Sequence, residues 1–154
     1  MNELINKALK LEEDEDVIES YELWKELALK YNAEIGWEML SNHLYSGKSY
    51  KSKPAALFCS LKAIRLNCEE EFIDSLLFQF RNNKEITEQL NKIKNFINYE
   101  DNDCEECPFY REDLDCNKCI SDNYKKSLNE LVDQLENIIY GSDKPTRLEQ
   151  FTIN

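Results

Sequence analysis

Glycine and proline are scarce in this chain: its 154 residues include only three of each. Sandwiches and barrels built from β-strands need many tight turns, which these two residues usually form. Long helices need far fewer such breaks. The scarcity therefore predicts an all-α fold, and the 42% hydrophobic content is sufficient for a packed core.

Apolar residues recur at intervals of three and four along most of the chain, which is the pattern of a helix with one buried face. Val17, Tyr21, Trp24 and Ala28 are an example. The pattern predicts helices at residues 2–11, 17–31, 33–46, 54–67, 69–81, 84–99 and 120–140. We expect a single helical domain over residues 1–154, with an irregular C-terminal tail at 142–154.

An internal repeat relates the middle helices. A shift of the sequence by 35 residues brings similar residues together, namely Ala28 with Ala63, Asn32 with Asn67 and Trp37 with Phe72. Tandem helical hairpins produce repeats of this length.

The segments AEIGWEMLSNHLYSGKSY and AALFCSLKAIRLNCEEEF resemble the paired helices of the tetratricopeptide repeat family. The resemblance covers about residues 16–99 and implies stacked antiparallel helical hairpins, with Ala56 and Ala63 at close helix contacts. It also implies that a peptide or protein binds along a concave face. Because the end of such a stack needs a cap, helix 120–140 is either that cap or a further core helix.

Four of the six cysteines occur as two closely spaced pairs, Cys104 with Cys107 and Cys116 with Cys119. Zinc prefers four ligands at tetrahedral corners, about 2.3 Å from the metal when they are thiolates, and two such pairs commonly supply them. We therefore expect a Zn²⁺ knuckle in segment 100–119. Four thiolates close the coordination shell, so the ion would be structural rather than catalytic.

Three other chemistries fit the same cysteines. A redox dithiol usually accompanies a thioredoxin-like strand and helix, which a helical chain lacks. Disulfides are typical of secreted proteins. An iron–sulfur cluster can use the same four sulfurs, and the spacing leaves this alternative open.

The cysteine segment is strongly acidic, with eight carboxylates against the single base Arg111 between Glu100 and Asp115. It is therefore unlike the basic zinc fingers that bind DNA. The simplest role of the metal is to hold helix 84–99 against helix 120–140. Between the two cysteine pairs, Pro108, Phe109 and Tyr110 either form a contact surface for a partner or pack inward.

The net charge of −12 and the absence of a secretory signal or a membrane span restrict the classes of function. A surface of this charge repels phosphates, which argues against direct binding to nucleic acid. We expect a cytoplasmic protein without membrane contact. In that reducing compartment paired cysteines more often bind metal than form disulfides.

No motif indicates an active site. His43 is the only histidine, and the sequence around it predicts a helix in which it is structural rather than catalytic. Cys59 and Cys68 have no nearby partner and are interpreted as packing groups. Six aromatic residues, which we expect to be mostly in the core, could instead line a groove: Tyr21, Trp24, Tyr31, Trp37, Tyr45 and Phe72.

Two functions from different classes follow. The first is a non-enzymatic protein–protein interaction module, an adaptor or scaffold with a structural zinc site and a protein or peptide partner. The alternative is a small acidic inhibitor, of the immunity or antitoxin type, that blocks a nucleic-acid-binding enzyme. Steep weakening of complex formation by salt would favour the inhibitor.

Overall fold

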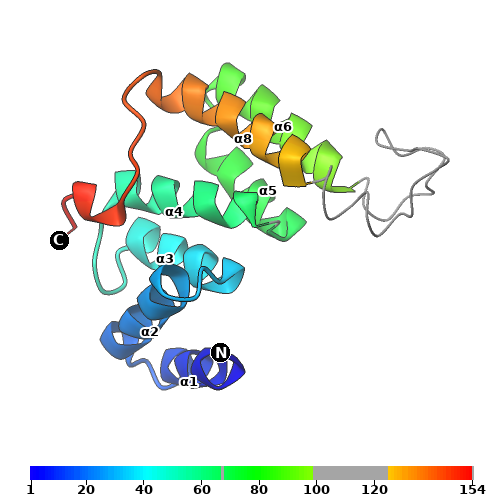
Figure 1. Cartoon of the computed structure of the whole chain (residues 1–154). Helices are drawn as coiled ribbons and strands as arrows, with labels where there is room; N and C mark the ends of the chain where they lie inside the picture. Colours follow the sequence, from blue (N-terminus) through cyan, green and yellow to red (C-terminus); the bar gives the residue numbers. More distant parts are fainter. Residues whose placement is uncertain (67, 99–124, 154) are drawn as a thin grey trace, which may run out of the picture. The chain divides into compact units, whose positions relative to one another are not determined.

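The computed structural model describes residues 1–66, 68–98 and 125–153 (Figure 1). Over these ranges the chain forms α-helices and one 3-10 helix, without any strand, so the predicted all-α class is confirmed for them. The elements are α1 (Asn2–Glu13), α2 (Val17–Leu29), α3 (Glu34–Ser46), α4 (Lys53–Arg65), α5 (Glu70–Gln79), α6 (Lys84–Asn98), α8 (Lys125–Tyr140) and η4 (Leu148–Gln150).

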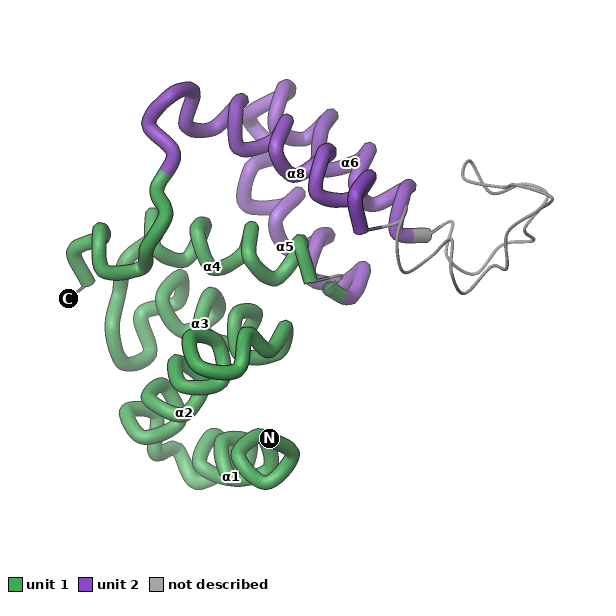
Figure 2. Tube along the Cα trace, viewed as in Figure 1, with its two compact units in different colours: residues 1–68, 145–154 green, residues 69–144 purple. Residues whose placement is uncertain are grey.

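The chain divides into two compact units (Figure 2). Unit 1 comprises residues 1–68 and 145–154, and unit 2 comprises residues 69–144. In unit 1, α1 packs against α2, α2 against α3, and α3 against α4. In unit 2, α6 packs against both α5 and α8.

Local signals set the ends of the helices in unit 1. Gly47 follows α3 with φ of 74° and donates its N–H to the His43 carbonyl at 2.9 Å, which is the left-handed conformation that glycine adopts without strain. Ser52 caps α4, because its Oγ accepts the N–H of Ala55 at 3.2 Å. Pro54 lies in the first turn of α4, where its missing N–H costs nothing.

The core of unit 1 contains large side chains from α2 and α3 and small ones from α4. Trp24, Leu27 and Leu40 have no exposed surface, and burial of each such side chain stabilises the fold by about 1.5–3 kcal/mol. α4 contributes small buried residues, including Ala56 and Ala63. Small side chains allow α3 to approach α4 closely.

A buried serine connects α3 to α4. Ser41 Oγ donates to the Ala56 carbonyl at 2.9 Å and lies 2.6 Å from Ser60 Oγ. Ser60 Oγ lies 2.9 Å from the same carbonyl oxygen, and because a hydroxyl has one proton, it donates either to this carbonyl or to Ser41 Oγ. Each of these three buried polar groups therefore has a hydrogen-bond partner.

The C-terminal tail is part of unit 1. It contains η4, which packs against α4, and the buried Leu148. The ring of Phe151 lies 5.5 Å from the ring of Phe58, centroid to centroid. Its apolar residues therefore dock onto the helices, although the sequence of the tail has no helical pattern.

Unit 2 is held by an apolar seam and by polar contacts between its helices. Leu90 and Ile93 of α6 and Leu128 and Leu135 of α8 are almost fully buried. Gln89 Nε2 donates to the Leu131 carbonyl at 2.9 Å, a side-chain bond from α6 to the backbone of α8.

Charged side chains connect α5 to α6 at the surface. Lys94 Nζ lies 2.6 Å from Asp74 Oδ1 and 3.5 Å from Glu70 Oε1. The hydrogen bond to Asp74 raises the pKa of Lys94.

None of the helices in the described ranges is both long enough and apolar enough to span a membrane.

Candidate functional site

The predicted zinc ligands and the aromatic residues between them lie outside the described residues: Cys104, Cys107, Pro108, Phe109, Tyr110, Cys116 and Cys119. The zinc site therefore stays a prediction. What the structure describes are the two helices that flank this segment. The end of α6 and the start of α8 lie at the same end of the helix pair (Figure 1).

The other two cysteines, Cys59 and Cys68, are buried. Burial raises the pKa of the Cys59 thiol to about 12. A thiol with such a pKa is protonated at neutral pH and is therefore a poor nucleophile. Their interpretation as packing groups agrees with this burial. Across the part of the chain that the structure describes, no cluster of three or more metal-ligating side chains occurs.

His43 belongs to a buried polar cluster that joins four segments of unit 1. His43 Nε2 donates to Glu12 Oε1, and Trp24 Nε1 donates to the same oxygen at 2.9 Å. Lys48 Nζ lies 4.0 Å from Glu12 Oε2. The second ring nitrogen of His43 lies 3.5 Å from Ser49 Oγ. The carboxylate at the end of α1 is thus bound by α2, by α3 and by the loop that follows α3.

The electrostatics of this cluster favour an ionised carboxylate. Burial acts to raise the pKa of Glu12, but the hydrogen bonds from His43 and Trp24 and the charge of Lys48 outweigh it and lower that pKa. His43 is only 1% exposed, and both of its ring nitrogens face protein groups. An imidazole in this position holds helices together and has no access to a substrate, which agrees with the structural role expected for it.

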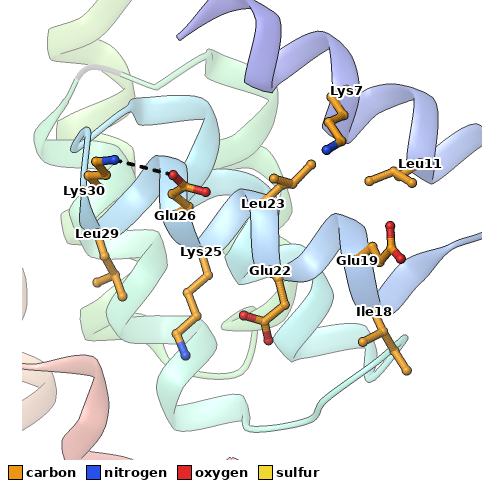
Figure 3. A pocket seen from close by; sticks show the side chains of 10 residues that line it. All are labelled: Lys7, Leu11, Ile18, Glu19, Glu22, Leu23, Lys25, Glu26, Leu29 and Lys30. Atoms are coloured by element: carbon orange, nitrogen blue, oxygen red, sulfur yellow. Dashed lines mark ion pairs between the residues drawn. The ribbon is translucent and has the colours of Figure 1, made fainter.

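A groove between α1 and α2 forms a concave surface on unit 1 (Figure 3). Its volume is about 540 Å³. Lys7 and Leu11 come from α1, Lys30 directly follows α2, and the other lining residues come from α2: Ile18, Glu19, Glu22, Leu23, Lys25, Glu26 and Leu29. Lys30 forms an ion pair with Glu26, with a distance of 3.8 Å between the charged atoms.

Large apolar side chains of this groove are in contact with solvent. Ile18 is 57% exposed and Leu29 is 44% exposed, at opposite ends of α2. The two residues share one face of α2, and helical spacing puts that face more than about 100° round the helix from core residues such as Trp24. Together with Leu11 and Leu23 they give this concave surface its apolar part, and exposed apolar area of this kind often marks a contact site.

The six aromatic residues considered as groove or core are mostly in the core. Tyr21, Trp24, Trp37 and Phe72 are at most 6% exposed. Tyr31 and Tyr45 are 41% and 39% exposed. None of the six lines the groove between α1 and α2.

Comparison with protein-family models, with curated proteins and with solved structures found no match to this chain. Functional inference therefore rests on the residues and their geometry.

Proposed function

We propose that this chain is a non-enzymatic protein–protein interaction module that binds a helical protein segment in the groove between α1 and α2. Stacked, tetratricopeptide-like hairpins form its scaffold, and a structural Zn²⁺ braces its C-terminal helices. The observation that carries the proposal is the solvent exposure of Ile18 and Leu29 on a concave, two-helix surface.

The walls of the groove favour a helical ligand. Both walls are helices, whose backbone N–H and C=O groups are paired within each helix. An extended peptide would find no backbone groups to pair with, whereas a helix satisfies its own backbone and needs only side-chain contacts. The alternation of apolar and charged residues along α2 suits a ligand with apolar side chains at intervals of three and four.

A photo-crosslinking amino acid at Glu19 tests this function. Glu19 lines the groove and is exposed, so a bound protein segment would lie within reach of the crosslinker. Irradiation of the full chain in an extract of its source cell is expected to give one discrete covalent protein adduct, which mass spectrometry identifies. The matched control carries the same crosslinker at Glu130, an exposed position of α8. Equal labelling from both positions, or no adduct from Glu19, would rule out the groove as a binding site.

The donor set of Cys104, Cys107, Cys116 and Cys119 fits Zn²⁺, since four thiolates satisfy a tetrahedral ion. The end of α6 and the start of α8, which flank this segment in the sequence, lie at the same end of the helix pair, and this supports a bracing role. A crosslink that closes a loop of about 15 residues stabilises a fold by roughly 3 kcal/mol through the unfolded state. We expect a contribution of that order to unit 2.

Native mass spectrometry of protein purified without chelators checks the metal. We expect one zinc ion per chain, lost in a Cys107→Ser variant and retained in Cys68→Ser, which removes a cysteine outside the two pairs. Loss of zinc is expected to reduce the helix signal in circular dichroism, because α6 and α8 fray at the ends that flank the segment. Full zinc occupancy of the Cys107→Ser variant would contradict the ligand assignment.

A further inference from the structure

Four side chains of α2 have the spacing of a coiled-coil seam. Ile18, Glu22, Lys25 and Leu29 follow one another at intervals of four, three and four residues, and we refer to them as the α2 stripe. Figure 3 shows all four pointing to the same side of α2, away from the side chains of α1. A seam with this spacing normally faces a second helix.

The α2 stripe is open to solvent. Its terminal members Ile18 and Leu29 are 57% and 44% exposed, Glu22 is exposed, and Lys25 is partly exposed. Neither Glu22 nor Lys25 forms an ion pair with any residue in the described ranges. Two apolar groups and two opposite charges are thus available for an intermolecular contact.

The order of the four residues is self-complementary. Along the helix the α2 stripe reads apolar, acidic, basic, apolar. An antiparallel copy of α2, related by a two-fold axis midway between Glu22 and Lys25, places Ile18 opposite Leu29 of the second copy. The same operation places Glu22 opposite Lys25 of the second copy. Because the axis is two-fold, each contact occurs twice, as in an isologous dimer interface.

We propose that the helix bound by this surface is α2 of a second copy of the chain, which packs along the α2 stripe at the α2 wall of the groove, so that the protein forms an antiparallel dimer. This inference rests on the proposed function, because it names the partner of the same surface. The interface consists of two apolar pairs that flank two ion pairs at the centre.

The charge of the groove favours this partner. A protein with a net charge of −12 repels its own copies over most of its surface. The lining residues of the groove include three lysines and three glutamates, so this surface has no net charge. Two copies can therefore approach here without net repulsion, and the opposite charges of Glu22 and Lys25 set the antiparallel direction.

The expected affinity is modest. One pair of helices of about three turns buries less surface than the roughly 1,200 Å² of a typical stable complex. We therefore expect a dissociation constant of the order of 10–100 µM, weakened by salt because the central pairs lie near solvent.

Charge reversal provides the test. In a Glu22→Lys homodimer two lysines would face each other at both central contacts, and in a Lys25→Glu homodimer two glutamates would. Each variant alone is expected to dimerise at least about tenfold more weakly than the original chain. An equimolar mixture restores both opposite-charge contacts and is expected to dimerise, as is the doubly substituted Glu22→Lys/Lys25→Glu chain.

Sedimentation equilibrium of the full chain measures how strongly each variant, and the mixture, dimerises. The control is Glu130→Lys, which makes the same charge change at an exposed position of α8 and is expected to leave dimerisation unchanged. Circular dichroism checks that the variants fold, and a folding defect would not be rescued in the mixture. A monomer at every concentration up to the millimolar range, or a dimer that survives both single reversals, would overturn the inference. If the Glu19 crosslinker then labels a different protein, the groove is a binding site for that protein and not for a second copy of the chain. If it labels nothing, both the proposed function and the proposed dimer are wrong.

Discussion

Replacement of Glu12 by alanine is expected to lower the free energy of unfolding of unit 1 by about 3 kcal/mol. The carboxylate accepts hydrogen bonds from Trp24 and His43, and its removal leaves two buried donors without an acceptor. A buried donor left without an acceptor typically costs about 1–3 kcal/mol, and two such donors, with Glu12 itself partly exposed at 16% of its side chain, give an expected value of about 3 kcal/mol.

Chemical denaturation followed by tryptophan fluorescence measures this effect. Glu13→Ala is the matched control, because Glu13 is the adjacent acidic residue of α1 but is exposed, and a change below about 0.5 kcal/mol is expected for it. Equal effects of the two substitutions would show that the cluster around Glu12 does not stabilise the fold.

The same cluster predicts a dependence on pH. Since the folded-state pKa of Glu12 lies below its ordinary value of 4.5, its stabilising contribution is complete above the unfolded pKa and is lost as pH falls through the folded one. A Glu12→Gln variant lacks this titration. The difference in unfolding free energy between the two proteins should therefore be largest near neutral pH and shrink below about pH 4.5. A difference that stays constant down to pH 3 would contradict the ionised state of Glu12.

Replacement of Gly36 by alanine is expected to destabilise unit 1 by about 1–3 kcal/mol, although alanine favours helices by about 1 kcal/mol over glycine. A Cβ atom at this position of α3 would lie 2.6 Å from the backbone nitrogen of Ala28 and 2.9 Å from the Leu27 carbonyl carbon. These are backbone atoms of α2, so no side chain can move aside. The two helices would have to separate and would lose part of their shared core.

Thermal denaturation of the Gly36→Ala variant, with Asn42→Ala as the matched control, tests whether α2 and α3 approach each other this closely. Asn42 is exposed on the same helix, so its replacement changes helix propensity without a steric clash. We expect a lower melting temperature for Gly36→Ala and an equal or higher one for Asn42→Ala. A more stable Gly36→Ala variant would mean that the helices are farther apart than described.

Helix positions could be predicted because their ends carry local signals. Gly47, Ser52 with Pro54, and Asn83, whose Oδ1 accepts the Ile86 N–H at 3.1 Å, each end or begin a helix through contacts within four residues. The predicted helix 17–31 extends two residues beyond Leu29, the last residue of α2. There Asn32 adopts a positive φ of 48°, which reverses the chain before α3.

The buried cluster and the groove depend on contacts that are distant in sequence. Glu12 is the first of five consecutive acidic residues at 12–16, a pattern typical of a solvated turn, yet its partner His43 lies 31 residues further on. The helical spacing of apolar residues does not indicate which of these acidic side chains contacts the protein interior. Likewise, Ile18 is exposed and Trp24 is buried although both are apolar, because the two lie on different faces of α2 and the neighbouring helices cover only one of these faces. The four-cysteine segment, whose spacing is the most specific signal in the sequence, lies outside the described residues.

Native mass spectrometry tests most directly whether the chain is an interaction module braced by zinc. The full chain is purified without chelators and measured over a series of micromolar concentrations. The predicted result is a population of two chains with two zinc ions that grows with concentration and reverts to single zinc-bound chains in Glu22→Lys. A single chain without metal at every concentration would contradict both the structural zinc and the self-complementary groove.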